Sequence, residues 1–376
     1  MRIGIDSRPF QGQLAGTGRY VLELCRALDQ WLPEAEFFLY GNEPYELPVT
    51  GYRWKKSFDE SILFDRLPAS IWYLERVGRL ARRDGIDIFW GSANFLPKGV
   101  GRNSGACASV LTVLDLVPDL YPETMSWKHQ LAYHLYFEQS LKAADRLVTI
   151  SHGSKDRLER KYAKPCDAVV YPCAGEAFKS PSVDLIRKVR DRYGLQSNFL
   201  LTVATLEPRK NLGNLLKAMI QLKSERGIVV PDLVLVGQVG WKAQVLLELI
   251  TSARAAGIKV LQTGFVPDED LPALYAASSA FVFPSIYEGF GMPVLEALKC
   301  GAYVLASDIP EIREAGGEYP KYFEPSLTGI ANALREFLLS DDYLYPDHAR
   351  FNRVINQGST WNEEGRKLAM VMKSLL

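Results

Sequence analysis

Short apolar runs alternate with longer segments of helical periodicity over nearly the whole sequence. The runs that begin at Phe199 and Leu233 are continuously apolar. Such runs are expected of parallel strands that are covered on both faces. The alternation therefore predicts doubly wound α/β sheets. The predicted strands are Arg2–Asp6, Glu36–Tyr40, Ile86–Trp90, Ser109–Leu114, Leu147–Ile150, Ala168–Tyr171, Phe199–Ala204, Leu233–Val236, Lys259–Thr263, Ala280–Phe283 and Tyr303–Ala306.

The alternating pattern starts again once. Tyr171–Gly175 closes the first series, and Phe178–Ser182 has the composition of a linker. A chain of 376 residues is also too long for one ordinary domain. We predict two similar Rossmann-like domains, residues 1–175 and 176–357, followed by an isolated amphipathic helix in residues 358–376.

Composition excludes several classes of protein. Hydrophobic residues make up 47% of the chain, as in globular proteins with sizeable cores. The 44 basic residues balance the 44 acidic ones, so no global charge favours nucleic acid. Five scattered cysteines form no CxxC pair, which argues against a zinc site and fits a reducing compartment. The first residues read as a strand and not as a signal peptide, and no apolar run could span a membrane. We expect a cytoplasmic protein.

One segment suggests a peripheral contact with the inner face of a membrane. Residues 71–83 have the pattern of a basic amphipathic helix, and Trp54 and Trp72 have the amphipathic rings that favour membrane interfaces. A solvated helix face explains the same pattern. The basic side chains at helical spacing are Arg76, Arg79 and Arg83.

The segment from Pro284 to Glu296 says most about function. An apolar strand precedes it, its glycines permit a tight turn close to a ligand, and Pro293 suits the first position of a following helix. A strand, a turn and a helix in this order direct backbone N–H groups at an anion. The residues predicted to approach that anion are Gly289, Phe290, Gly291 and Met292.

Two carboxylates frame the predicted anion site, Glu288 before the helix and Glu296 in its first turns. A carboxylate repels phosphate but accepts hydrogen bonds from hydroxyl groups. A phosphate with hydroxyls on both sides describes a sugar nucleotide. For Glu296, a favourable interaction with the helix dipole is an equally simple explanation.

A second group of residues lies at Thr205–Asn211. Asn211 is predicted to cap the helix that follows, which places Arg209 and Lys210 at the positive end of that helix. Cations there oppose the helix dipole unless an anion intervenes, and a diphosphate would supply that anion. The alternative is a solvated basic loop.

A third group follows the first strand, within residues 11–20. It contains Gly16, Thr17 and Gly18, which permit close approach of the backbone to a ligand. As a dinucleotide fingerprint it is incomplete, because the third glycine of GxGxxG is absent.

The string from Pro284 to Glu296, with its E-x7-E spacing, resembles the donor site of retaining glycosyltransferases of family four. That resemblance implies the GT-B fold, in which two Rossmann-like domains face each other across a cleft and the last helix crosses back to the first domain. It implies that Glu288 contacts the transferred sugar, that Glu296 holds the ribose and that Arg209 and Lys210 bind phosphate. The loop with Gly16, Thr17 and Gly18 would face the donor, and Gly264, Phe265 and Val266 would hold the base.

The sequence departs from this family at one place. Many relatives have a His followed by Asp at the end of the strand near residue 114, and that His contacts the donor sugar. This chain has Leu114, followed by Asp115, whose carboxylate would face the acceptor. His152, after the strand Leu147–Ile150, is the best substitute by topology, although a residue at the start of a helix explains it equally well.

Together these patterns predict a retaining hexosyltransferase. It would move a hexose from a nucleoside diphosphate sugar to a saccharide or lipid-linked glycan in bacterial surface polysaccharide synthesis. We expect no cofactor and no metal, because we identify no Asp-x-Asp triplet of the kind that bridges to a divalent metal. Arg209, Lys210 and helix N-termini would instead stabilise the departing diphosphate. The alternatives are an NAD-dependent oxidoreductase and a non-catalytic subunit that binds sugar nucleotides.

Overall fold

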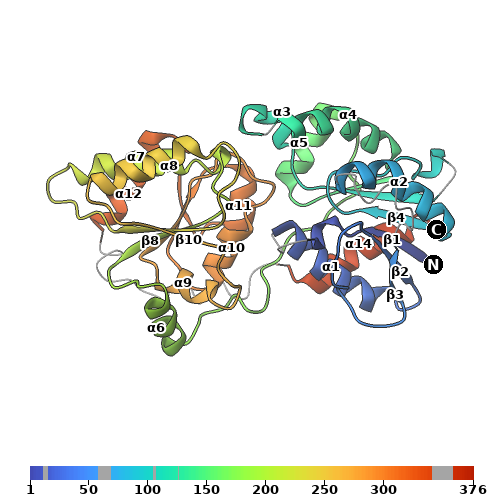
Figure 1. Cartoon of the computed structure of the whole chain (residues 1–376), viewed down its shortest axis with the longest axis horizontal. Coiled ribbons are helices and arrows are strands. Elements are labelled where there is room, and N and C mark those ends of the chain that lie inside the picture. Colours follow the sequence, from blue (N-terminus) through green and yellow to red (C-terminus); the bar gives the residue numbers. More distant parts are fainter. Residues whose placement is uncertain (12–15, 58–68, 105–106, 126, 341–358) are drawn as a thin grey trace. The chain divides into compact units, whose positions relative to one another are not determined.

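The computed structural model describes residues 1–11, 16–57, 69–104, 107–125, 127–340 and 359–376. The chain forms two compact units, each built around its own parallel sheet (Figure 1). Unit 1 consists of Met1–Leu116, Trp127–Cys173 and Ser359–Leu376. Unit 2 consists of Val117–Ser126 and Ala174–Gly358. The predicted α/β fold with two doubly wound sheets is therefore confirmed.

Unit 1 contains a seven-stranded parallel sheet with the order β3-β2-β1-β4-β5-β6-β7. The order reverses direction between β1 and β4, which makes this sheet doubly wound. Its strands are β1 (Arg2–Asp6), β2 (Glu36–Tyr40), β3 (Trp54–Ser57), β4 (Ile88–Gly91), β5 (Ala108–Val113), β6 (Arg146–Thr149) and β7 (Ala168–Val169).

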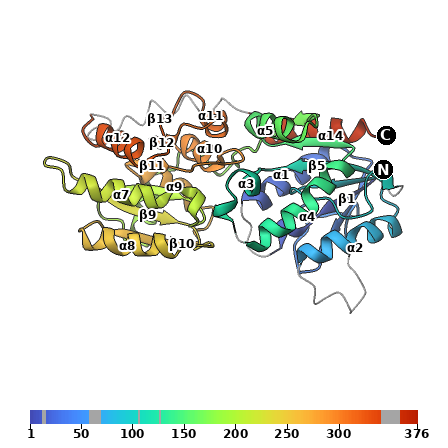
Figure 2. The same ribbon diagram turned by 90° about the horizontal axis from the view of Figure 1, so that it is seen from above.

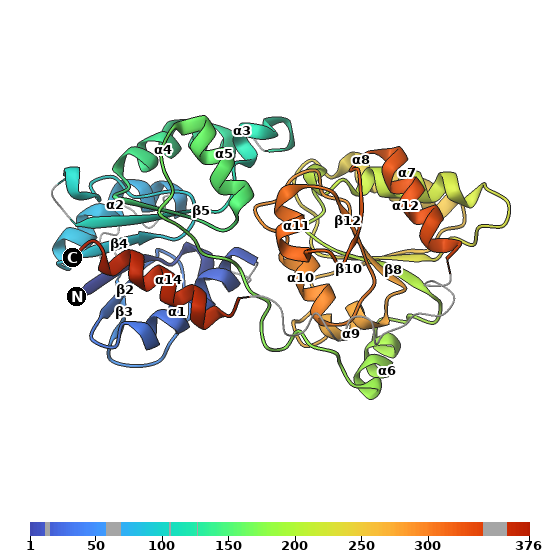
Figure 3. The same ribbon diagram turned by 180° about the vertical axis from the view of Figure 1, so that it is seen from behind.

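Helices cover both faces of this sheet (Figure 3). Helices α1 and α14 lie on one side, and α2, α4 and α5 lie on the other. The helices are α1 (Gly16–Trp31), α2 (Ala69–Arg83), α4 (Trp127–Ala143), α5 (His152–Tyr162) and α14 (Trp361–Lys373), with short 3-10 helices η1 (Arg8–Phe10) and η2 (Arg102–Ser104).

Helix α14, the last of the chain, packs against α1 in unit 1. A capping box at Thr360 starts the helix. Its buried Glu364 accepts a hydrogen bond from the Tyr171 backbone N–H at 2.8 Å. Gly365 allows the two helices to approach closely, because a Cβ built on it would lie 2.2 Å from the Ala27 Cβ. The end of the chain is therefore an integral layer of unit 1.

Unit 2 contains a six-stranded parallel sheet with the order β10-β9-β8-β11-β12-β13, so its direction reverses between β8 and β11. Its strands are β8 (Phe199–Val203), β9 (Asp232–Val236), β10 (Val260–Gly264), β11 (Ala280–Phe283), β12 (Val304–Ser307) and β13 (Lys321–Phe323). Its helices are α3 (Val117–Leu120), α6 (Val183–Arg192), α7 (Leu212–Lys223), α8 (Gln244–Ala255), α9 (Leu271–Ala277), α10 (Met292–Lys299), α11 (Pro310–Gly316) and α12 (Leu327–Leu338), with η3 (Pro122–Thr124) and η4 (Pro208–Lys210).

Two apolar cores hold the sheet of unit 2, one on each face. Helices α12, α7 and α8 lie side by side on one face (Figure 2). Helices α6, α9, α10 and α11 contribute side chains to the core on the other face. Both cores are built from the continuously apolar runs of the strands, which place one set of side chains on each face. The sheet is thus a rigid support for the loops at its edges.

The structure differs from the sequence-based prediction at the sheet edges. The predicted strands all exist, with ends displaced by two residues or fewer. Strands β3 and β13 were not predicted. Both are short edge strands, and the exposed Lys55, Lys56 and Lys321 interrupt the apolar signal. Charged side chains are typical of edge strands, which must not pair with other chains.

The division into units also differs from the predicted domains at one place. Unit 1 ends its second segment at Cys173 and regains the chain at Ser359, within two residues of the predicted positions. However, residues 117–126 belong to unit 2, although they lie far inside the predicted N-terminal domain. We call residues 117–125 the strap. The strap could not be predicted from the sequence, because it has no apolar periodicity and its contacts are with residues far away in the sequence.

The close contact at Gly365 gives a stability prediction. Replacement of Gly365 by Leu should lower the free energy of unfolding by about 1–3 kcal/mol, because the side chain would force α14 away from α1. Urea unfolding followed by circular dichroism measures the change. Met370→Leu, at an exposed position of the same helix, is the control and should stay within about 0.5 kcal/mol of wild type. Wild-type stability of the Gly365 variant would contradict the close packing.

Candidate functional site

The predicted site residues of unit 2 lie at the carboxyl ends of its parallel strands. Residues 204–211 follow β8, residues 264–266 end or follow β10, and residues 284–296 follow β11. Strands β8 and β11 are neighbours at the point where the strand order reverses. In open α/β sheets, ligands bind in the crevice outside such a switch point. The topology therefore brings Arg209 and Glu288 together, although 79 positions separate them.

Four charged side chains form a compact cluster at this switch point. Arg209 Nη1 lies 2.7 Å from Glu288 Oε2, and Lys210 Nζ lies 2.6 Å from Glu288 Oε1. Arg209 Nη2 also lies 2.6 Å from Glu207 Oε1. The four side chains are at most 14% exposed. Two cations and two carboxylates balance each other, as buried charges must.

Burial and charge oppose each other in the cluster. Burial raises the pKa of the Glu288 carboxyl, but Arg209 and Lys210 outweigh it and hold that pKa at about 2. Burial also lowers the pKa of Lys210, against the raising effect of the Glu288 carboxylate. Glu288 is therefore ionised at neutral pH and fixed in place by two cations at once.

The cations predicted at the start of α7 lie in the separate short helix η4, with Pro208 at its start. Asn211 occupies the N-cap position of α7, as predicted, but its side chain does not cap the helix. Asn211 has a left-handed backbone (φ 58°), and its side chain makes no capping hydrogen bond. Its amide nitrogen instead donates to the carbonyl oxygens of Pro284 and Pro325, each at 3.0 Å. Asn211 thus ties the loop after β8 to the loop after β11.

The sequence suggested that a bound diphosphate balances the charge of Arg209 and Lys210. In the structure these cations do not depend on a diphosphate. The protein supplies the anions itself through Glu288 and Glu207. Glu207 was overlooked, although it lies two residues before Arg209 in the sequence. It is 3% exposed, and its Oε2 has no hydrogen-bond partner among the described residues. An acidic residue next to a basic pair is a signal that could have revealed it.

The turn before α10 forms as predicted. Gly291 precedes the helix with a φ of 113°, which a side chain would disfavour, and Pro293 occupies its first turn. Glu288 lies before this turn, and Phe290 is buried behind it. Glu296 is 3% exposed within α10 and accepts a hydrogen bond from the Tyr275 hydroxyl at 3.1 Å. Tyr275, a core residue of α9, was not foreseen as a partner that orients this carboxylate.

The three residues predicted to hold a base lie at the end of β10. The Gly264 carbonyl accepts a hydrogen bond from the Gly237 N–H at 2.8 Å, so the loops after β9 and β10 are joined. Phe265 is 48% exposed, whereas Val266 is buried. Gly264 has a φ of 69° and open space where a Cβ would lie. An exposed aromatic ring at this edge offers a flat apolar surface to a ligand.

The remaining predicted residues lie in unit 1. Gly16, Thr17 and Gly18 form the first turn of α1 rather than a loop, with Gly16 and Thr17 exposed. Residues 12–15 of the same string lie outside the described residues. Leu114 follows β5, and its backbone N–H donates to the Asn94 side chain at 2.7 Å. Asp115 is half-buried beside it. These residues belong to a different unit from the cluster of Glu288.

The histidine considered as a substitute for the family's His is the first residue of α5. His152 is exposed, and its ring lies 6.0 Å from the Tyr171 ring. Ser151 caps that helix by accepting from the Ser154 N–H at 3.0 Å. A helix-start position therefore accounts for His152.

Residues 71–83 lie in α2, so the predicted helix exists, but its tryptophan does not support a membrane contact. Trp54 and Trp72 are 4% and 1% exposed, so neither ring is available to a membrane interface. Among the described helices, none is long and apolar enough to cross a bilayer. Helix α4 exposes more apolar surface than α2, through Trp127, Leu131 and Leu135. Peripheral membrane contact stays a prediction.

The described residues contain no group of three or more His, Cys, Asp or Glu side chains that could hold a metal ion. The sequence does contain one Asp-x-Asp triplet, at Asp268–Asp270 before α9, which the sequence argument overlooked. Asp270 of this triplet pairs with Arg192 at 2.6 Å and accepts from the Tyr193 hydroxyl at 3.0 Å. Its carboxylate thus holds α6 against α9.

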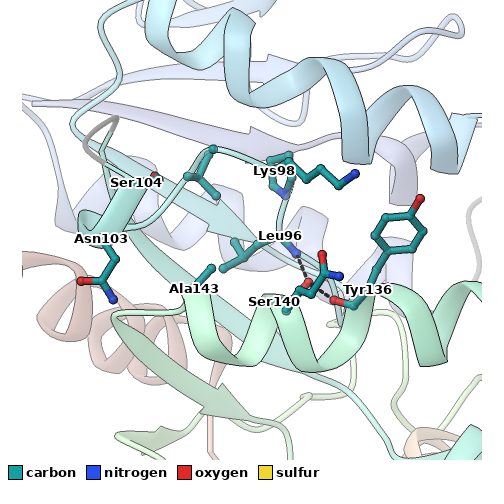
Figure 4. A pocket seen from close by; sticks show the side chains of 11 residues that line it. Leu96, Lys98, Asn103, Ser104, Tyr136, Ser140 and Ala143 are labelled. Carbon is teal, nitrogen blue, oxygen red and sulfur yellow. Dashed lines mark hydrogen bonds between the residues drawn. The ribbon is translucent and has the colours of Figure 1, made fainter.

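A pocket of about 300 Å³ lies in unit 1, between α4 and the loop that follows β4 (Figure 4). Two of its polar side chains have partners within unit 1. Ser140 accepts from the Leu96 N–H at 3.0 Å and donates to the Tyr136 carbonyl, while Lys98 pairs with Glu75. The pocket contains none of the predicted site residues.

Comparison with known proteins adds to this geometry. The family model described as Glycosyl transferases group 1 matches residues 186–352. The O-antigen chain mannosyltransferase B of Escherichia coli is 31% identical over 363 residues, which cover 91% of each chain. The serotype-specific mannosyltransferase WbdA of Escherichia coli is 26% identical over 92% of this chain, which spans 44% of that longer protein. Anabaena HepE, solved with UDP and glucose, has the same fold, with a TM-score of 0.71 at 17% identity over the full length of both chains.

The lowered pKa of Glu288 makes stability depend on pH. The folded state loses its proton near pH 2 and the unfolded state near 4.5, so the stabilisation is complete above pH 4.5 and is lost as the pH falls towards 2. Over that range we expect wild type to lose on the order of 3 kcal/mol more unfolding free energy than Glu288→Gln. Urea unfolding at a series of pH values measures the difference. Glu318→Gln, which removes an exposed carboxylate, should keep the wild-type dependence, and the same dependence in Glu288→Gln would refute the charge cluster.

Proposed function

This chain belongs to the glycosyl transferases of group 1, and we propose that it transfers a mannosyl residue from a nucleoside diphosphate donor. The predicted GT-B fold and the predicted membership of a glycosyltransferase family are confirmed. Family membership also removes the alternative of an NAD-dependent oxidoreductase. The proposal adds the sugar, the donor, the stereochemistry and the roles of individual residues.

The ion cluster at the switch point is the observation that carries the donor proposal. Arg209 and Lys210 are held at the carboxyl edge of the sheet by Glu288 and Glu207, so they need no reorganisation when a ligand binds. An arginine has five N–H donors and a lysine three, so each can serve a carboxylate and a phosphate together. The start of α10 adds backbone N–H groups directed at the same anion. Fixed positive charge of this kind favours a diphosphate.

The two glutamates would then bind the hydroxyl groups on either side of the diphosphate. Glu288 is held between two cations and would accept hydrogen bonds from the transferred sugar. Glu296 is oriented by Tyr275 and would accept from the ribose. In unit 1, Gly16, Thr17 and Gly18 would approach the donor and Asp115 the acceptor. Gly264, Phe265 and Val266 would hold the base.

We propose that transfer proceeds with retention of configuration. The bond between the anomeric carbon and the diphosphate oxygen breaks, and the acceptor hydroxyl oxygen bonds that carbon on the same face. The proton of the acceptor hydroxyl passes to the departing phosphate oxygen. Arg209 and Lys210 stabilise the negative charge that grows on the diphosphate. Such electrostatic stabilisation is usually the largest single contribution to the lowering of the activation barrier.

The acceptor is proposed from the relatives. Two of them are named as mannosyltransferases, one of O-antigen chains and one serotype-specific. A saccharide or lipid-linked glycan of a bacterial surface polysaccharide fits both names. A non-catalytic subunit that binds sugar nucleotides is the remaining alternative, because Leu114 replaces the histidine that contacts the sugar in many relatives.

A donor screen tests the proposed function. Thermal shift with UDP-, GDP- and ADP-sugars, mannose donors included, identifies the donor that stabilises the protein by binding the folded state. The selected donor is then incubated with lipid-linked and free oligosaccharides, and the anomeric configuration of the product is read by NMR. A retained mannosyl product supports the proposal. Donor binding without transfer to any of these acceptors supports the non-catalytic alternative.

The two glutamates should differ in kinetics. Glu288→Gln should lower kcat strongly with a modest change in KM, because contacts with the departing sugar strengthen in the transition state. Glu296→Gln should mainly raise the KM for the donor, since ribose is bound equally in the ground and transition states. Steady-state assays over a range of donor concentration measure both, with Glu318→Gln as the control. Full kcat in the Glu288 variant, or an unchanged donor KM in the Glu296 variant, would reject that residue's role.

Transfer should not require a divalent metal, because Arg209 and Lys210 already supply the positive charge that the diphosphate needs. We expect nearly the full rate in the presence of EDTA. An assay of metal-stripped protein, with and without added magnesium or manganese, measures the dependence. A rate that returns only when the metal is added would contradict the prediction and direct attention to Asp268.

A further inference from the structure

The strap, residues 117–125, lies between β5 and α4 in the sequence, yet it belongs to unit 2. Strand β5 and helix α4 both belong to unit 1. The chain thus leaves unit 1 after Leu116, adds a short helix and a 3-10 turn to unit 2, and returns at Trp127. Neither the family resemblance nor the proposed chemistry accounts for this excursion.

Three contacts hold the strap to the loops of unit 2. The Tyr121 ring is stacked on the Tyr287 ring, with the ring centroids 5.7 Å apart and the planes inclined by 28°. The Trp241 indole N–H donates to the Thr124 carbonyl. The Lys242 ammonium donates to the Glu123 carbonyl at 2.6 Å. The strap therefore joins the loop after β9 to the loop after β11.

Tyr287 also connects the strap to the charged cluster. Its side chain is 1% exposed, and the residue that follows it is Glu288. Its carbonyl oxygen accepts a hydrogen bond from Arg209 Nη1 at 2.8 Å, the same nitrogen that pairs with Glu288. The position of this carbonyl therefore helps to set the direction of the guanidinium group. A contact that fixes the position of Tyr287 therefore also helps to fix the guanidinium group of Arg209.

We propose that Tyr121 is a positioning residue for the donor diphosphate. Its ring packs on Tyr287, which holds the Tyr287 carbonyl and the Glu288 backbone in the arrangement that aims Arg209. The Trp241 and Lys242 hydrogen bonds keep the strap in place so that Tyr121 stays on Tyr287. This inference rests on the proposed function, because it assigns Arg209 to a diphosphate. It adds to that function a control point 88 residues from Arg209 in the sequence.

A purely structural role for the stack makes a different prediction. If Tyr121 only covered apolar surface, its loss would lower stability and leave ligand affinity unchanged in the folded protein. If it positions Arg209, strap docking and diphosphate binding are coupled. Coupling is reciprocal, so the ligand must then also stabilise the docked strap. If Tyr121 only covered apolar surface, its loss would change neither the ligand affinity nor the protection of the strap by the ligand.

The first experiment measures nucleoside diphosphate binding by calorimetry, at a temperature where every variant is folded. The probe is the diphosphate of the base selected in the donor screen. Tyr121→Ala should raise the Kd about three- to tenfold, the range that the loss of one aromatic pair allows. Tyr121→Phe keeps the ring and should bind like wild type. Tyr52→Ala, which removes a tyrosine that is 87% exposed in unit 1, is the matched control.

The second experiment measures hydrogen exchange in residues 117–125 of the full chain. The diphosphate should slow exchange there in wild type and in Tyr121→Phe, but not in Tyr121→Ala at a ligand concentration that saturates that variant. Trp241→Phe removes the indole N–H that holds the strap and should also speed exchange in the absence of ligand.

The outcomes separate the two proposals. If wild type binds the diphosphate and Tyr121→Ala binds it equally well, the positioning role is wrong and the proposed function stands. The same conclusion follows if the diphosphate does not change hydrogen exchange in the strap of the wild-type protein. If wild type binds none of the three nucleoside diphosphates, both the donor proposal and the role of Tyr121 are wrong.

Discussion

The neutralisation of buried charge at the switch point of unit 2 is the constraint on which the site depends. The side chains of Arg209 and Lys210 are largely buried, and a buried cation is costly unless an anion faces it. Glu288 and Glu207 supply that anion within 2.7 Å. The same pairs fix the direction of each side chain, so one arrangement both compensates the buried charges and sets their geometry.

The sheet topology makes that arrangement possible. Parallel strands deliver their following loops to one edge, and the reversal between β8 and β11 separates the helices that would otherwise cover it. Asn211 and Tyr287 then tie the loops to each other, through carbonyls of Pro284 and Pro325 and through the guanidinium group of Arg209. The charged side chains therefore lie on short connecting segments that a rigid sheet positions.

Much of this could be predicted from the sequence because the signals are local. Continuous apolar runs identified the central strands, and glycine and proline positions identified the turn before α10. What could not be predicted depends on distant partners. The strap has no apolar periodicity of its own. Tyr275 has the sequence context of a core residue, and nothing local shows that its hydroxyl bonds Glu296. Asn211 is a residue type that favours helix caps, but its side chain bonds the carbonyls of Pro284 and Pro325. Edge strands β3 and β13 were missed because charged residues, which protect edges, remove the apolar signal.

The position of α14 has a consequence for folding during synthesis on the ribosome. Domains usually fold in the order of synthesis, N-terminal first. Here the layer beside α1 includes Gly365, Leu368 and Met372 of α14, which are translated long after α1 and after all of unit 2. Unit 2 has every one of its segments, strap included, before α14 is translated. Unit 1 is therefore completed after unit 2, and a nascent chain that stalls before α14 contains every segment of unit 2 but a unit 1 whose core is still open.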